Sequence, residues 1–159
     1  MADIIPKYES NPYIFPFHGC NINRATNQTI PDMMATTVAW SQALFDSANF
    51  FNPAAPTQIT IPFTGVYLFG IELTYDAPLM IANESVTVLR NASGQLVRLA
   101  YVVNVGTATA IAGSSLHQLN NGDVLTISTT QNSGAPLDIL ATPPNSPQFW
   151  LKLVGYRVI

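Results

Sequence analysis

The chain has 159 residues, a formal net charge of -3 and only 9% charged residues beside a hydrophobic fraction of 48%. This length fits one domain, the absence of a basic cluster argues against nucleic-acid binding, and no apolar run approaches the roughly 18 residues of a membrane helix. About 25% charged residues is usual, so the deficit indicates a protein whose surface is largely covered by partners.

The N-terminus and the cysteine content bear on the compartment. No basic region followed by an apolar stretch begins the chain, so we expect no signal peptide. Without a secretory signal, the sequons at Asn27, Asn83 and Asn91 are interpreted as chance matches. The single cysteine, Cys20, cannot form an intramolecular disulfide. A bridge to another chain stays open, but a reduced, inert thiol is the favoured interpretation.

Residues 1–35 differ in composition from the rest of the chain. Four prolines interrupt them, and proline breaks helices and central strands. The segment is nevertheless too aromatic for a disordered linker. We therefore predict an extended arm, which either packs on its own domain or grips a neighbouring subunit or a larger particle. The residues expected to anchor it to a particle are Tyr8, Tyr13, Phe15 and Phe17.

Residues 36–159 alternate between apolar or β-branched stretches and turn clusters. Strand patterns occupy 36–42, 58–61, 65–75, 85–90, 95–103, 124–129 and 149–159, with a less regular one at 108–119. Turn residues fill 52–56, 91–94 and 120–123, where Asn, Gly and Pro gather. Helix signals are nearly absent, and 43–51 has at most a turn. Short strands at this spacing predict a β-sandwich or jelly roll.

The stretch 65–75 is apolar on most of both faces. The period of two puts Tyr67 and Phe69 on one face, and Val66 and Leu68 on the other. Two apolar faces need two partners, so we favour the sandwich core on one side and a neighbouring subunit on the other. The alternative is that both sets lie in one thick core.

The order of motifs resembles a known family. Residues 59–69, ITIPFTGVYLF, are similar to the apolar-x-x-Pro-x-x-Gly-x-Tyr-x-Phe pattern of the complement-q globular head, a relative of the tumour-necrosis-factor jelly roll. Residues 46–51, 85–94, 119–124 and 149–156 resemble further segments of that family in the same order. The collagen-like stalk is missing, and the opening strand around Trp40 departs from the family pattern. The resemblance implies an antiparallel jelly roll of about eight to ten strands that assembles as a homotrimer.

The segments around Trp40, 46–51 and 57–62 look most like tailed-bacteriophage structural proteins with this fold. The resemblance therefore implies a trimeric virion protein, with residues 1–35 as arm and 36–159 as trimerisation domain. Family members trimerise through aromatic sheet faces. The residues expected at the trimer interface are Tyr67, Phe69, Phe149, Leu151 and Tyr156.

Catalytic and ligand-binding patterns are sparse. Neither His18 nor His117 has a metal-ligating neighbour at the right spacing. Glu72 and Asp76 would lie about 13 Å apart on an extended strand, too far to share a calcium ion. No phosphate loop, nucleotide fingerprint or Gly-x-Ser-x-Gly elbow occurs. We therefore expect no enzyme activity, no cofactor and no metal site. Trp40, Trp150 and Tyr156 could stack on sugars, but they lie in strand patterns, which favours packing.

The leading hypothesis is a non-enzymatic virion structural protein, a homotrimeric capsid decoration or head-fibre protein on the capsid surface. Its expected partners are itself and the major capsid protein or another virion protein, with no nucleic acid and no membrane. The alternative is a trimeric receptor-binding tip of a tail fibre that recognises host carbohydrate. The number of copies per particle discriminates the two.

Overall fold

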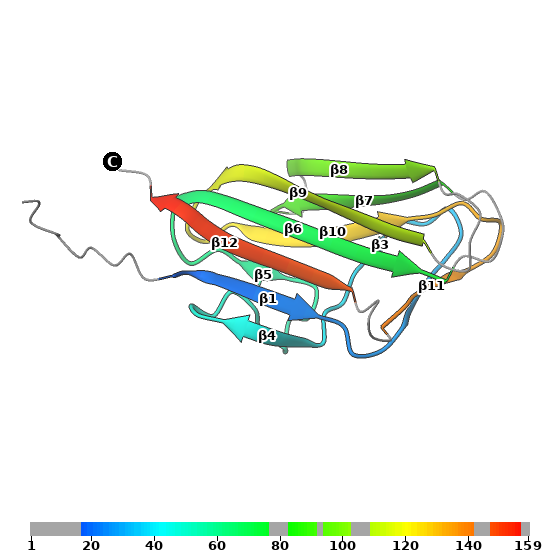
Figure 1. Ribbon diagram of the computed structural model, residues 1–159, viewed down its shortest axis with the longest axis horizontal. Coiled ribbons are helices and arrows are strands. Elements are labelled where there is room, and N and C mark those ends of the chain that lie inside the picture. Colours follow the sequence, from blue (N-terminus) through cyan, green and yellow to red (C-terminus); the bar gives the residue numbers. More distant parts are fainter. Residues whose placement is uncertain (1–16, 77–82, 92–93, 103–108, 142–146, 157–159) are drawn as a thin grey trace, which may run out of the picture.

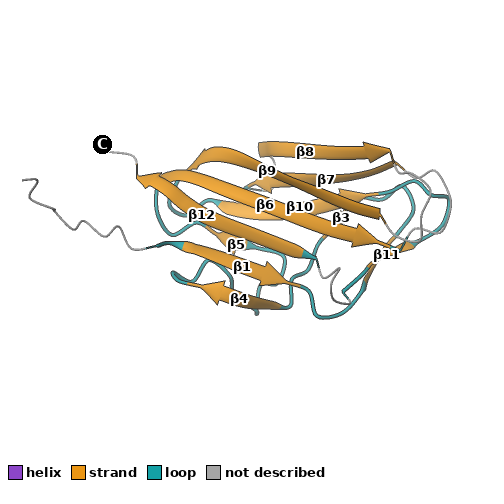
Figure 2. Cartoon of the chain, viewed as in Figure 1, coloured by secondary structure: helices purple, strands orange, loops and turns teal. Residues whose placement is uncertain are grey.

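The computed structural model describes residues 17–76, 83–91, 94–102, 109–141 and 147–156. These residues form antiparallel β-strands without a helix, arranged as two packed sheets (Figures 1 and 2). The predicted all-β sandwich is therefore confirmed. The strands are β1 Gly19–Asn23, β2 Gln28–Ile30, β3 Thr36–Thr37, β4 Gln42–Asp46, β5 Ile59–Thr60, β6 Gly65–Tyr75, β7 Asn83–Arg90, β8 Gly94–Val102, β9 Thr109–Leu119, β10 Val124–Thr130, β11 Leu137–Ile139 and β12 Gln148–Tyr156.

The longer strands agree with the sequence patterns, and β6 has the predicted bounds. The described strands outnumber the predicted eight to ten, because β1, β2 and β11 lie outside the predicted strand patterns and β4 lies mostly in a predicted turn; β2 and β11 hold only three residues each. The pattern at 36–42 divides into β3 and the start of β4, and residues 43–46 extend β4 where a turn was expected. Two or three residues are too few to show alternation in a sequence.

The two sheets differ in size. The seven-stranded sheet has the order β2-β11-β6-β12-β1-β4, with β9 paired to β6, and the five-stranded sheet has the order β3-β10-β7-β8, with β5 paired to β10. Strand β6 lies between β9, which pairs along its whole length, and β12. The first described strand, β1, pairs with the last, β12, so distant parts of the chain close one sheet (Figure 1).

The core fills the space between the sheets and is rich in aromatic rings. On β6 the odd-numbered residues from Tyr67 to Tyr75 are at most 3% exposed. Phe69 stacks on Phe149 of the neighbouring strand at 5.8 Å, and Phe50 meets Tyr67 edge-on at 6.2 Å. Such pairs add to the free energy gained by apolar burial. One continuous apolar cluster therefore holds both sheets together.

The predicted boundary between an arm and a domain at residues 35 and 36 is wrong. Strand β1 pairs with both β12 and β4, β2 pairs with β11, and Cys20, Ile22 and Ile30 lie in the core. Residues 19–30 are thus part of the sandwich. The arm interpretation now applies only to residues 1–16, which lie outside the described residues together with Tyr8, Tyr13 and Phe15.

Two predicted turns meet at one end of the five-stranded sheet. Gly122 has a φ of 85° and Asn91 a φ of 49°, the left-handed region that these residue types accept most readily. The Asn91 amide donates to Asp123 Oδ1 over 2.9 Å, and Asp123 Oδ2 accepts from the backbone N–H of Asn120 over 2.8 Å. The turns thus fix each other, as turn chemistry in the sequence indicated.

Candidate functional site

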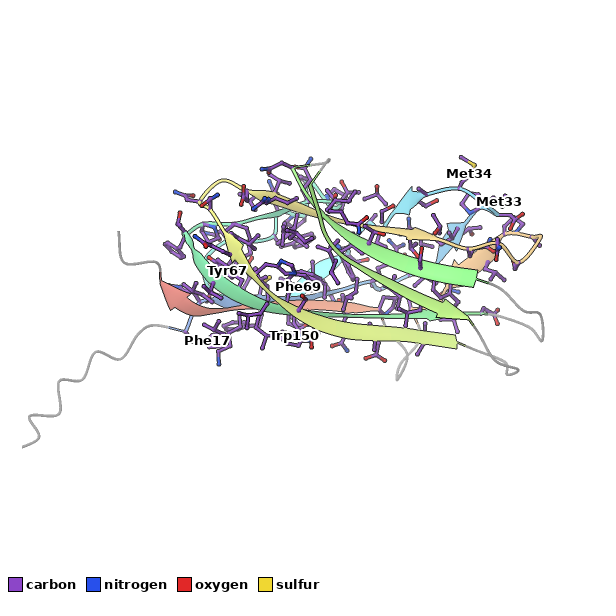
Figure 3. The ribbon with its side chains drawn as sticks, turned by 90° about the horizontal axis from the view of Figure 1, so that it is seen from above. Phe17, Met33, Met34, Tyr67, Phe69 and Trp150 are labelled. Atoms are coloured by element: carbon purple, nitrogen blue, oxygen red, sulfur yellow. The ribbon has the colours of Figure 1, made fainter. Side chains whose placement is uncertain are left out.

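The residues predicted for the trimer interface occupy the core of a single chain. Tyr67, Phe69, Phe149 and Leu151 are at most 2% exposed, and Figure 3 shows Tyr67 and Phe69 between the two sheets. A side chain without exposed surface has none to contribute to another subunit. The prediction is therefore corrected for these four residues. For Tyr156, the structure describes the backbone, which pairs with Gly65, and its place in an interface stays a prediction.

The opposite face of the same strands carries exposed apolar residues, and we call it the apolar face. Trp150 is 36%, Val154 47% and Leu116 58% exposed, and Trp150 and Phe17 lie on the outer side of β12 (Figure 3). The strand register places Trp150 beside Gly70, and Leu68 beside Leu116. The members of the apolar face are Phe17, Phe45, Val66, Leu68, Leu116, Trp150 and Val154.

Two aromatic rings of the apolar face lie over glycines. A Cβ atom at Gly70 would overlap the indole of Trp150, and one at Gly19 would overlap the backbone oxygen of Leu151 and crowd the Phe17 ring. The missing side chains let both rings lie close to the sheet. Phe17 also packs against Phe45 at 5.5 Å, at the edge strand β4. These contacts hold both rings against the outer side of the sheet.

The apolar face carries few charges, and one of them, Lys152, lies among its apolar members. Lys152 lies in the row of Leu68, with its Nζ 5.3 Å from the centre of the Phe17 ring. Glu72 is exposed one row beyond Gly70, and Asp76 follows β6. Within the described residues, no group of three or more His, Cys, Asp and Glu side chains could hold a metal ion. Exposed Lys152, Ser114 and Gln118 therefore share this face with its apolar members.

Phe17 is the one predicted anchoring residue inside the described region. Its ring is 53% exposed and contacts Phe45 and Lys152 of its own chain. The ring thus belongs to the apolar face, at the point where residues 1–16 precede β1. A role in anchoring stays a prediction.

His117 was singled out in the sequence and is half-buried on β9. Its Nε2 lies 2.8 Å from Ser115 Oγ, and its ring stacks on Phe69 at 5.4 Å. Burial, and to a lesser degree the positive charge of Arg90, lower the pKa of His117 below its ordinary value. A nucleophile–base pair needs a third group to orient the base, and no carboxylate bonds to His117 in the described part of the chain. The geometry therefore fits a packed strand residue.

The two other aromatic candidates have different surroundings. Trp40 is 2% exposed and packs against Phe149 at 6.3 Å, so it cannot stack on a sugar. Trp150 is partly exposed, but its indole packs closely against Gly70 on the apolar face. No helix in the described ranges has the length and apolar character needed to cross a membrane.

The residues that form the apolar face were only partly foreseen. The period of two identified Val66 and Leu68 as a second face of β6, but the assignment of the two faces was reversed. Phe45 and Leu116 gave no signal, since irregular patterns surround them, and Val154 lies in a predicted strand whose outward face was not identified. The exposed face of β6 can be identified only when its pairing with β9 and β12 is known, and periodicity alone does not give that pairing.

Comparison with solved structures identifies the fold. The globular domain of zebrafish complement 1qA aligns with a TM-score of 0.66 at 14% identity, covering 89% of this chain and 99% of that one. Eiger, a TNF from S. frugiperda, gives 0.64 at 15% identity, covering 91% and 96%. Murine APRIL at pH 5.0 gives 0.63 at 15% identity, covering 86% and 99%. No protein-family model and no curated protein sequence matches the chain. The chain therefore has the jelly-roll fold of TNF and complement-q globular domains.

Proposed function

We propose that this protein is a homotrimeric virion structural protein, a capsid decoration or head-fibre protein whose subunits associate through the apolar face. The observation that carries the proposal is the set of exposed apolar residues on one sheet of a chain with very few charges. Exposed apolar patches of this kind mark interaction sites. The jelly-roll fold, which homotrimers of the resembling family share, supports three copies.

Association through this face explains the low charge content. An obligate interface commonly buries more than about 2,000 Å² in total and is apolar. Burial of the apolar face would remove from water the partly exposed side chains of Trp150, Val154 and Leu116. The remaining surface of each subunit would then contact the particle or face solvent.

The mass of the protein in solution tests the trimer. The wild type should sediment at about three times 17.2 kDa at micromolar concentration. Leu116→Glu should dissociate it, because an unpaired charge buried at the interface costs several kcal/mol per subunit. Met34→Glu is the matched control, since Met34 is 60% exposed, Leu116 is 58% exposed, and Met34 lies at the other end of the molecule (Figure 3). A folded wild-type monomer would contradict the trimer.

A second experiment tests the virion role separately. Quantitative mass spectrometry of purified particles should find the protein at high copy number, whereas a handful of copies would indicate a tail location. A variant that lacks residues 1–16 should keep the trimer mass and lose co-sedimentation with stripped capsids. If co-sedimentation is undiminished, residues 1–16 do not attach the protein to the particle. A variant without residues 1–35 is unsuitable, because it lacks β1 and β2.

A further inference from the structure

A groove of about 220 Å³ lies on the outer side of the five-stranded sheet, on the sheet opposite the apolar face. Strands β7 and β10 supply most of its lining, with Gln95 of β8 and Ala35 at its margins. The described residues that line it contribute hydroxyl groups, one amide and two apolar side chains, and none of them is charged. The lining residues are Ala35, Ser85, Thr87, Leu89, Gln95, Ser128, Thr129 and Thr130.

The strand register gathers the hydroxyl groups in pairs. Ser128 lies opposite Thr87, and Thr130 lies opposite Ser85, whose Oγ is 2.7 Å from Thr130 Oγ1. Alternation directs these four side chains outward, because the adjacent residues Val88, Ile127 and Thr129 on the same strands are buried in the core. Thr87, Ser128 and Thr130 are half-buried, so their hydroxyls are reachable and not fully solvated.

A buried hydrogen-bond chain fixes the groove from the core side. Thr129 Oγ1 donates to the backbone oxygen of Ser85 over 2.8 Å and therefore accepts from the Tyr75 hydroxyl, with which it is also bonded. Tyr75 has no exposed surface and Thr129 only 1%. The chain ties β10 and β7 together directly beneath the hydroxyl pairs. Because the groove is already rigid, it loses less conformational entropy when it binds a ligand.

We propose that this groove binds a neutral carbohydrate, through a single pyranose unit. Ser and Thr hydroxyls and the Gln amide both donate and accept hydrogen bonds, as sugar hydroxyls do. An apolar ligand would leave these groups unpaired, which costs free energy. None of the described lining residues carries a charge that could pair with a charged ligand. Leu89 and Ala35 offer apolar contact to the C–H groups of the ring.

The site does not depend on the proposed virion role or on the trimer. It lies on the sheet that association through the apolar face leaves uncovered. If the trimer forms, three grooves are presented together, and weak sites gain affinity through multivalency. A single groove of this size with a few neutral hydrogen bonds implies a millimolar dissociation constant.

Saturation-transfer NMR and amide shift mapping of the full chain test the site. The probes are glucose, galactose and N-acetylglucosamine, with glycerol as an acyclic polyol and sialic acid as a charged sugar. At least one neutral pyranose should shift amides of 85–89 and 128–130. Thr87→Val and Ser128→Ala should each weaken its binding about fivefold, the loss of one hydrogen bond. Thr126→Val is the control, because Thr126 lies on the same sheet face outside the groove and opposite Leu89.

The results of these experiments either support or overturn the carbohydrate site. Shifts confined to the groove and lost in Thr87→Val, with Thr126→Val unchanged, support the site. Absence of shifts with every neutral sugar, shifts located elsewhere, or equal shifts with glycerol overturn it. Stronger binding of sialic acid would overturn the neutral class. Because the sedimentation mass is measured independently, failure of this site and failure of the trimer are distinguishable.

Discussion

The indole of Trp150 lies across the backbone of Gly70, its directly paired neighbour on β6. The ring atoms Nε1, Cε2 and Cζ2 lie only 2.3–2.5 Å from the position that a Cβ atom at residue 70 would take. The opposite side of the ring contributes to the exposed surface, which leaves Trp150 36% exposed. A glycine in a strand usually weakens the sheet, unless another group approaches closely there. Here the indole is that group.

This contact predicts that Gly70→Ala destabilises the protein. The added methyl group must displace the indole, and overpacking of this kind costs about 1–3 kcal/mol. The cost exceeds the gain of about 0.4–1 kcal/mol from the smaller entropy of the unfolded chain. Urea unfolding should therefore show a lower midpoint.

The matched control for this prediction is the same substitution in a Trp150→Ala background. Without the indole, Gly70→Ala should be neutral or stabilising, so the two substitutions should be strongly non-additive. An equal loss of stability in both backgrounds would show that the glycine is needed for another reason.

Asp46 predicts a second effect on stability, at the end of β4. Its Oδ1 accepts the backbone N–H groups of Ala48 and Phe50 over 3.2 and 3.0 Å, and its Oδ2 accepts that of Phe51 over 2.9 Å. These bonds shape the loop that delivers Phe50 and Phe51 to the core. Asp46→Asn replaces one acceptor by a donor and should cost about 1–3 kcal/mol. Exposed Asp76→Asn is the control, and an equal effect of both would contradict this role.

The sequence revealed the sandwich and most of its long strands because alternation and turn chemistry are local. The register of β6 against β9 and β12 is not local, and it decides which face of β6 is buried. The face of β6 that carries Tyr67 packs against Phe50 in the core, whereas the face that carries Leu68 points outward beside Leu116. Both sides looked apolar in the sequence, so their assignment needed the tertiary structure. Strands β1 and β2 were missed because nearby prolines dominated the pattern.

The surroundings of His117 predict that the free energy of unfolding depends on pH. Burial and Arg90 lower its pKa below 6.5, so the unfolded chain takes up a proton at a higher pH than the folded protein does. The unfolded state then binds more protons, and the free energy of unfolding falls as the pH drops through the range below 6.5. His117→Gln removes this contribution, so its stability should decline less than that of the wild type between about pH 7.5 and pH 5.5. Parallel declines in the two proteins would show that other groups carry the effect.

The last prediction concerns Cys20, which is 3% exposed in the core beside β12. Burial, with a smaller contribution from the negative charge of Asp46, raises the pKa of its thiol well above the ordinary range. Because the thiolate is the reactive form, a chromogenic disulfide reagent should label the native protein only as fast as the chain opens. In guanidinium chloride the same reagent should titrate one thiol per chain. Rapid labelling of the native protein, or a cysteine-dependent dimer on non-reducing gels, would contradict the inert thiol and reinstate an intermolecular bridge.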